Sequence, residues 1–573
     1  MTSPGVLEPE PLASSSPRPW ERRIAGRPVV AGILSGLLLW SSFPPLEWHW
    51  LAWFALTPLF GLAVFERPRL RLYLGAWAGG LVFWLLSIQW VRLTDPSAWL
   101  AWVTMAVVLS LWWPGFLALI RYAVRGLRLP LIVAAPLIWV GLEFVRAHFL
   151  TGFPWYYLGH SQYRFLALIQ VADVASALGV SFLIAVVNAW LVDLVSLPLL
   201  QNSPAGPRLT QRQTVRLWAV TLLIGGTLIY GAYRLSTARF REGPRLALLQ
   251  TNFEQRYKMG GDPAALVERI HDLIRRAISA EPLPDLIVWP ETSYPYGYIA
   301  IDPAVALPEL SRQLAQVSPD VRVEDWVRKR DDIDHHLRGL AAAARVPMLV
   351  GTTYYDHRPG GLRKYNSAVL FEPLVQSIQA YHKIHLVPFG EYVPFLEAFP
   401  WLTVLTPYRN GHIPSLAFGQ EAKLIQLGPY QLAVAICFED SVPHVVRRFF
   451  AEAGSGHEPD VLINLSNDGW FHGSSELDMH LAVSVFRTIE QRVPLARAVN
   501  TGISALIDGN GEIRETLPKL SESVLLVTVP LDDRTSYYTR WGDWLGISCL
   551  AVTIGLVPVG VIRRRLHDRR KES

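Results

Sequence analysis

Long apolar runs constrain this chain more than any other feature of its sequence. A helix of about 20 apolar residues can cross a bilayer, and backbone groups in lipid must hydrogen-bond within their own segment. The sequence therefore predicts a polytopic α-helical membrane bundle of eight spans. Seven runs precede residue 240 and one lies near the C-terminus: 29–43, 51–65, 72–90, 99–120, 131–145, 179–200, 218–233 and 544–561.

The composition agrees with a membrane protein. Hydrophobic residues make up 51% of the 573 residues and charged residues only 18%, and the mean hydropathy is +0.24. The 22 tryptophans suit aromatic belts at the boundary between water and lipid. Only two cysteines are present, which excludes a disulfide framework. No CxxC pair or HExxH motif indicates a metal site, so we expect neither metal nor cofactor.

Arginines alternate between the connections of the predicted spans and orient the bundle. Cytoplasmic loops are rich in Lys and Arg, so we expect both termini in the cytoplasm and residues 240–540 on the outer side of the membrane. Arginines confined to short loops and a tail also give little support to nucleic-acid binding. The inner connections carry Arg67, Arg69, Arg71, Arg121, Arg125, Arg128, Arg208, Arg212 and Arg216, and the outer ones Arg92, Arg146 and Arg164.

Residues 241–535 form a polar segment in which short strand-like runs alternate with helical spacing. This alternation predicts a layered α/β domain. Residues 301–334 are expected to be an irregular exposed insertion, either a lid or plain surface. The aromatic connection 143–159 is expected to be either an interfacial anchor or a wall for a lipid or peptide substrate. The expected strands are 245–251, 285–289, 346–355, 367–371, 431–437, 461–465, 505–507 and 524–529, and the helices 263–279, 443–453 and 475–491.

Three separate motifs in this domain carry the members of one catalytic mechanism. Cys437 ends an apolar strand, Glu291 follows Trp-Pro, and Lys383 and Glu391 share a loop bounded by Pro and Gly. A neighbouring cation lowers the pKa of a thiol, so Lys383 is expected to activate Cys437, and Glu291 can accept its proton. Each residue also has a plainer interpretation: a core cysteine, a surface lysine and a strand-end carboxylate.

The motifs Trp289-Pro-Glu291, Lys383 and Ile436-Cys-Phe-Glu439 resemble the Glu–Lys–Cys triad of the nitrilase superfamily. Together with the spans, the chain is similar to the apolipoprotein N-acyltransferases over residues ~25–565. Further motifs carry the resemblance: Thr151-Gly-Phe-Pro-Trp155, His382 to Pro394, Ser466-Asn-Asp-Gly-Trp-Phe471 and Asn500-Thr-Gly-Ile503. It implies a disordered leader (1–24), a seven-span membrane domain (25–240), a nitrilase-like αββα sandwich (241–535), an eighth span (540–563) and a basic cytoplasmic tail (564–573).

The resemblance also implies a reaction at the cell inner membrane. The cysteine takes the sn-1 acyl chain of a phospholipid, usually phosphatidylethanolamine, as a thioester. The N-terminal amine of a diacylglyceryl-cysteine apolipoprotein then accepts it. By similarity Glu291 is the general base, Lys383 the oxyanion stabiliser and Cys437 the nucleophile, with Glu391 and Glu439 as supporting carboxylates. Two departures are Phe438, where the family often has Tyr, and Met259, where it has Trp.

Two other functions remain open from the sequence. One keeps the thioester chemistry but makes water the acceptor, as in a membrane-tethered nitrilase-type amidase or lipid hydrolase. The persistence of a thioester until an amine arrives separates this function from a transferase. The other is a catalytically silent membrane scaffold, against which the intact Glu291, Lys383 and Cys437 argue.

Overall fold

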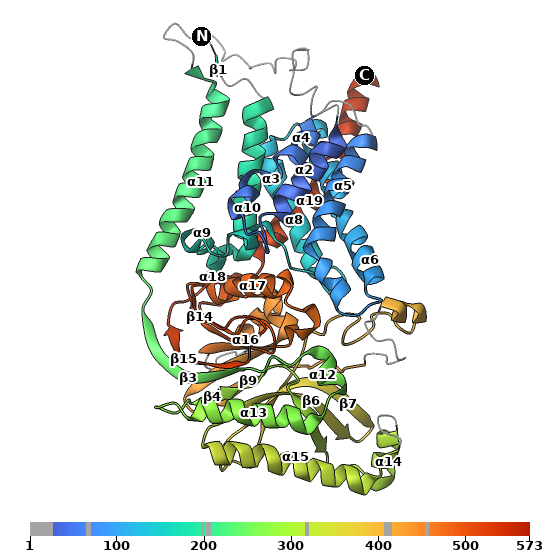
Figure 1. Cartoon of the computed structure of the whole chain (residues 1–573). Coiled ribbons are helices and arrows are strands. Elements are labelled where there is room, and N and C mark those ends of the chain that lie inside the picture. Colours follow the sequence, from blue (N-terminus) through green and yellow to red (C-terminus); the bar gives the residue numbers. More distant parts are fainter. Residues whose placement is uncertain are drawn as a thin grey trace.

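The N-terminal part of the chain is a bundle of apolar helices (Figure 1). The computed structural model describes residues 27–64, 70–196, 200–201, 208–315, 320–405, 415–452 and 458–572. The expected leader 1–24 and the loop arginines Arg67 and Arg69 lie outside these residues. The bundle contains α2 (Pro28–Trp40), α3 (Ala52–Ala55), α4 (Thr57–Val64), α5 (Leu70–Ser87), α6 (Trp99–Ser110), α7 (Trp112–Arg121), α8 (Leu131–His148), α9 (Leu166–Ile169), α10 (Ala172–Ser196), α11 (Gln211–Ser236), α18 (Tyr537–Trp541) and α19 (Trp544–Glu572).

Helix lengths support several membrane spans. Within the described residues, five helical segments are long and apolar enough to cross a bilayer: Leu70–Ser87, Trp99–Gly126, Leu131–His148, Ala172–Ser196 and Gln211–Ser236. Three further apolar segments, Pro28–Trp40, His49–Val64 and Trp544–Leu556, are shorter. All eight predicted runs are thus helical, while the count of eight spans stays a prediction.

Paired glycines let two of these helices touch. Gly32 and Gly36 on α2 are four residues apart, as are Gly75 and Gly79 on α5. A Cβ at Gly32 would overlap the backbone carbonyl of Gly75, and one at Gly36 that of Gly79. Small residues at this spacing allow close backbone packing where no hydrophobic effect drives helices together.

The C-terminal part contains two sheets. One has the order β14-β13-β12-β11-β10-β9, and the other the order β15-β3-β4-β6-β7-β8, with β5 paired to β6. In the first sheet β10, β11 and β12 run parallel. The strands are β3 (Phe240–Gln250), β4 (Leu286–Val288), β5 (Tyr294–Ile301), β6 (Met348–Arg358), β7 (Gly361–Phe371), β8 (Gln379–His382), β9 (Leu424–Leu427), β10 (Tyr430–Ile436), β11 (Val461–Ser466), β12 (Leu495–Val499), β13 (Ala505–Ile507), β14 (Ile513–Thr516) and β15 (Ser523–Asp532).

The two sheets pack face to face between two layers of helices (Figure 1). Alternate residues of β3 show this arrangement, since Leu246 and Leu248 belong to the core shared with β10, whereas Ala247 and Leu249 belong to a core shared with the outer helices. The expected αββα sandwich is therefore present. The helices are α12 (Gln255–Gly260), α13 (Pro263–Ile278), α14 (Leu307–Ala315) and α15 (Val323–Ala344) on one side, and α16 (Pro443–Ala451) and α17 (Ser475–Gln491) on the other.

The expectation of an irregular insertion at 301–334 was wrong. This region contains α14 and most of α15, whose buried residues Trp326, Ile333 and Leu337 fall on one face. A helix with one narrow apolar stripe has a polar overall composition, which hid it in the sequence. Figure 1 places α14 and α15 on the side of the sandwich away from the bundle, so they are not a lid between the two parts.

A buried ion pair joins the sandwich to the bundle. Arg492, directly after α17, lies 2.6 Å from Asp173 on α10, and both side chains are fully buried. Arg234 on α11 lies 2.9 Å from the same carboxylate. Removing one partner of such a pair leaves a buried charge uncompensated. The sandwich is therefore held in a defined orientation beneath the bundle (Figure 1).

Candidate active site

Cys437 lies at the carboxyl end of a buried central strand. Residues Leu432 to Ile436 of β10 are buried, and Cys437 opens the 3-10 turn η6 (Cys437–Ser441). Its φ is +52°, a left-handed conformation that residues other than glycine rarely adopt. Such strain is often found at functional sites. Cys437 is partly exposed, although the strand behind it is not.

Charged side chains from other strand ends surround a buried ammonium beside this turn. Lys383, directly after β8, is 1% exposed. Its Nζ lies 2.8 Å from Glu391 Oε2 and 3.7 Å from Glu291 Oε1, and both Lys383 and Glu291 act electrostatically on the Cys437 thiol. The structure thus brings together Glu291, Lys383, Glu391 and Cys437, which the sequence placed in three separate motifs.

The charges of this group set its protonation. Burial alone would lower the pKa of Lys383, but Glu391 and Glu291 outweigh it and hold that pKa above its ordinary value. Burial and then Glu291 raise the pKa of Cys437 well above its ordinary value, against the lowering effect of Lys383. Lys383 thus acts on the thiol in the expected direction, but burial and Glu291 outweigh its effect. The resting thiol is protonated and needs a base when it attacks.

Glu439 braces the two loops that carry Cys437 and Lys383. Its carboxylate is fully buried, and burial raises its pKa to about 7 even though Lys383 acts in the opposite direction. The carboxylate accepts hydrogen bonds from the N–H groups of Ile436 (2.7 Å), Ile384 (2.7 Å) and His385 (2.9 Å) and from the hydroxyl of Tyr381 (2.9 Å). Because these donors belong to both loops, Glu439 fixes the spacing between the loops.

Phe438 contacts the membrane side of the site. Its ring is stacked on Trp155 at a centroid distance of 6.2 Å and on His385 at 5.9 Å. Trp155 ends the Thr151-Gly-Phe-Pro-Trp155 segment, which Arg146 holds by donating to the carbonyls of Phe153 (2.8 Å) and Trp155 (2.6 Å). The aromatic connection is therefore a wall of the site. The Phe438 ring provides apolar contact without a hydroxyl, whereas the side chain of Met259 lies outside the described residues.

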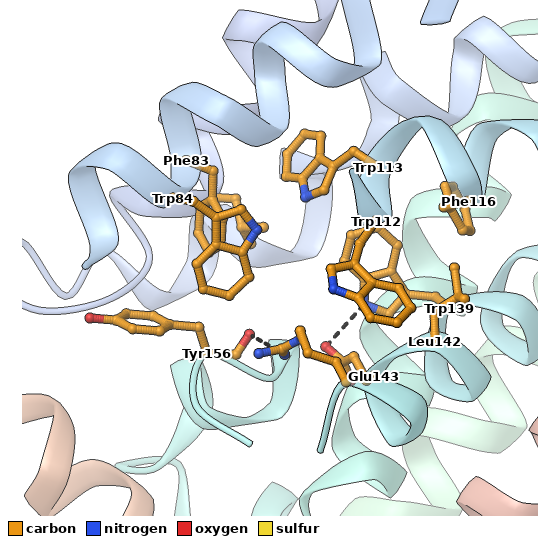
Figure 2. A pocket seen from close by; sticks show the side chains of 11 residues that line it. Phe83, Trp84, Trp112, Trp113, Phe116, Trp139, Leu142, Glu143 and Tyr156 are labelled. Atoms are coloured by element: carbon orange, nitrogen blue, oxygen red, sulfur yellow. Dashed lines mark hydrogen bonds between the residues drawn. The ribbon is translucent and has the colours of Figure 1, made fainter. Parts of the chain in front are cut away.

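Two cavities adjoin this wall. One of about 240 Å³ lies between the end of α8 and the loops of the sandwich, and is lined by Thr151, His385, Tyr392, Phe418 and His444, among others. A smaller one of about 40 Å³ lies inside the bundle among Trp84, Trp113, Trp139, Glu143 and Tyr156 (Figure 2). There Glu143 accepts a hydrogen bond from Trp139 at 3.0 Å. The first cavity thus lies where the end of α8 meets the loops of the sandwich, next to His385, which stacks on Phe438.

Sequence reasoning missed two polar residues of the site. Asn366 donates from Nδ2 to Glu291 (2.7 Å) and to Glu391 (2.9 Å), so it holds both carboxylates. Lys258 donates to the carbonyl oxygen of Glu291 at 3.0 Å and to the Thr292 hydroxyl at 2.9 Å. Burial lowers its pKa to about 8, although Glu291 and Cys437 act in the opposite direction. An asparagine at the start of an apolar strand was the only sequence indication of Asn366.

One group among the described residues has the spacing of a metal site. Ligand atoms of Asp468, Glu476 and His480 lie within 4.8 Å of one another. Cations already face the carboxylates of this cluster, because His480 Nδ1 is 3.3 Å from Asp468 Oδ1 and Arg497 acts electrostatically on both Asp468 and Glu476. We therefore expect these residues to hold protons and not a metal ion.

Comparisons with known proteins agree with this geometry. The chain matches the model of the apolipoprotein N-acyltransferase N-terminal domain over residues 35–190 and that of carbon-nitrogen hydrolases over residues 245–539. A protein named apolipoprotein N-acyltransferase from Geobacter metallireducens is 33% identical, over 95% of this chain and 98% of its own. This chain belongs to the apolipoprotein N-acyltransferase family. It is an N-acyltransferase that acts in the N-acylation of lipoproteins.

Other relatives extend the comparison. The apolipoprotein N-acyltransferase of Chlorobaculum tepidum is 30% identical, over 95% of this chain and 98% of its own. Among solved structures, a CN-hydrolase superfamily protein from Xanthomonas campestris covers 50% of this chain and 91% of its own, at 17% identity and a TM-score of 0.33. The match to the carbon-nitrogen hydrolase model gives the C-terminal half of this family member a nitrilase-like fold, and apolar helices precede it.

Proposed function

We propose that this apolipoprotein N-acyltransferase family member transfers its acyl chain in two steps through a thioester on Cys437. In the first step Glu291 takes the thiol proton, the sulfur attacks the sn-1 ester of a phospholipid such as phosphatidylethanolamine, and Glu291 returns this proton to the leaving oxygen, so that a neutral lysophospholipid departs and the carboxylate is free again. In the second step the N-terminal amine of a diacylglyceryl-cysteine apolipoprotein attacks the thioester. Its proton passes to Glu291 and returns to the sulfur, so that the thiol is regenerated.

The observation that carries this proposal is a buried lysine ammonium, Lys383, held among carboxylates beside the cysteine. Both tetrahedral intermediates place a negative charge on oxygen, and a buried ammonium next to the sulfur stabilises that charge. Lys383 is that ammonium, held by Glu391 at 2.8 Å. Asn366 and Glu439 keep the surrounding carboxylates and loops in place, and Phe438 with Trp155 forms the apolar wall. No step needs a metal or cofactor.

The release of the acyl chain tests this function against the hydrolase alternative. Purified full-length protein incubated with phospholipid labelled in its sn-1 chain is expected to hold the label as a hydroxylamine-sensitive thioester. Adding a diacylglyceryl peptide with a free N-terminal amine should move the label to the peptide within minutes, while the same peptide with an acetylated amine should not. If the label leaves equally fast in water alone, the protein is a hydrolase and the transferase mechanism is rejected.

We also propose the domain division given by the sequence, with residues 241–535 facing the outer side of the inner membrane and both termini in the cytoplasm. Leu374, in a loop of the sandwich, is 95% exposed, and Gln211 starts α11 at the opposite end from the sandwich (Figure 1). A membrane-impermeant maleimide should label Leu374→Cys in right-side-out spheroplasts and Gln211→Cys only in inverted vesicles. The reverse pattern would contradict the orientation.

A further inference from the structure

A buried polar network that the steps above do not use lies directly behind the nucleophile. Strands β10 and β11 are parallel, with Ile436 opposite Leu465. Cys437, which follows Ile436, and Ser466, which follows Leu465, therefore lie side by side at the ends of two neighbouring strands. The Ser466 hydroxyl donates to Asp468 Oδ1 at 2.6 Å, and it lies close enough to Cys437 to act to lower the pKa of the thiol. Ser466 and Asp468 are fully buried, so water cannot take the place of either partner.

This hydroxyl has two acceptors but only one proton to donate. While the sulfur is a neutral thiol or a thioester it is a weak acceptor, and the proton stays with the Asp468 carboxylate. A thiolate is a far stronger acceptor, because hydrogen bonds to a charged atom are roughly twice as strong as neutral ones. The donor can turn to the sulfur only if Asp468 keeps another donor.

His480 provides that other donor. Its Nδ1 lies 3.3 Å from Asp468 Oδ1 and its Nε2 lies 2.8 Å from Asp440 Oδ1. Burial and the charge of Arg497 oppose protonation, but Asp440 and Asp468 raise the pKa of His480 to about 10. The ring is therefore an imidazolium at pH 7, and both of its nitrogens donate. Asp468 keeps this bond when Ser466 turns away.

We propose that Ser466 is a catalytic hydrogen-bond donor that turns from Asp468 to the Cys437 sulfur whenever the thiolate forms, and that His480 is the positioning residue that frees its proton. The inference rests on the proposed role of Cys437 and deepens it. The hydroxyl bonds the thiolate before attack, returns to Asp468 in the thioester, and bonds the sulfur again as the amide forms. No covalent bond to Ser466 or His480 is made.

Other charged groups also act on the Cys437 thiol and on the His480 ring, so the test must separate their effects from that of Ser466. The thiol is also influenced by Glu291 and Lys383, and by Lys258 of α12. His480 is faced by Asp440, Asp468, Glu476 and Arg497. Removing the imidazolium thus also removes a charge near the sulfur. A double-mutant cycle separates that direct effect from an effect that passes through Ser466.

The test measures the rate at which iodoacetamide alkylates Cys437 in the full-length protein between pH 7 and 9, with mass spectrometry to exclude reaction at Cys549. Below the thiol pKa this rate is proportional to the thiolate fraction. We expect Ser466→Ala to lower it about tenfold, which corresponds to one pKa unit, and Ser466→Thr to restore it. His480→Gln should lower the rate clearly more in the otherwise wild-type chain than in the Ser466→Ala background, where only its direct charge effect on the sulfur is left.

The matched control is Ser504→Ala, another fully buried serine, whose hydroxyl accepts from the Val499 N–H at 3.1 Å. It should leave the alkylation rate unchanged, and thermal unfolding checks that each variant is folded. An unchanged rate in folded Ser466→Ala, an equal fall in Ser504→Ala, or additive effects of Ser466→Ala and His480→Gln would each overturn the inference. If Cys437 carries no acyl label in wild type, the proposed function fails instead, whatever the alkylation rates show.

Discussion

The Cys437→Ser variant is expected to form no acyl-enzyme from labelled phospholipid and to lose lipoprotein N-acylation by a factor on the order of 10³ or more. A serine hydroxyl in this site is far harder to deprotonate than a thiol, and it lies among the carboxylates of Glu291 and Glu391. The raised pKa of the Cys437 thiol already shows that the site resists a new negative charge, so a less acidic nucleophile should fail completely.

The chain contains its own matched control for this experiment. Cys549 is the other cysteine, and it is fully buried on α19. Cys549→Ala should keep acyl-enzyme formation within a few-fold of wild type, with the label in the peptide that contains Cys437. A hydroxylamine-sensitive label that persists in Cys437→Ser would show that another residue carries the acyl chain.

The sequence predicted those helices and strands that a local pattern of apolar, capping and turn residues determines. The helix at Ser475–Gln491 has the predicted bounds, because Ser474 caps its first turn and a left-handed residue, Arg492, ends it. The strand carrying Cys437 was also confirmed as β10, since a short apolar run followed by a turn has few alternatives. The membrane helices were predictable because lipid leaves the backbone no other choice.

The features that the sequence did not predict depend on contacts between residues far apart in the chain. Strands β5, β8, β9, β12 and β14 were missed because sheet neighbours, and not their own short sequences, determine them. The network of Asp440, Asp468, His480 and Arg497 comes from four separate elements, so no spacing in the sequence indicates it. The net direction of the thiol pKa could not be predicted for the same reason, because the extent of burial, whose effect outweighs that of the nearby lysine, is a property of the folded site.

The Lys383→Met variant is expected to lose both activity and stability. Without its ammonium, the buried carboxylate of Glu291 and the half-buried one of Glu391 keep only neutral donors, the shared Asn366 amide and the Val387 N–H that bonds Glu391. Removing one partner of a buried ion pair typically costs about 3–5 kcal/mol, and losing an oxyanion donor lowers the acylation rate by about 10²–10³-fold. Lys423→Met, at an exposed lysine, should change neither property.

The pH dependence of that destabilisation has a definite sign. In the variant no ammonium compensates the negative charge of the two carboxylates, so the folded site favours their neutral form more than the unfolded chain does. The folded state is then stabilised at low pH, and this stabilisation is lost as the pH rises and the carboxylates become charged. The difference in Tm between wild type and Lys383→Met should therefore widen from pH 5 to pH 8. If the Tm difference is constant over this range, or if Lys383→Met acylates at the wild-type rate, the role of Lys383 is contradicted. The proposed mechanism requires its charge to balance the surrounding carboxylates.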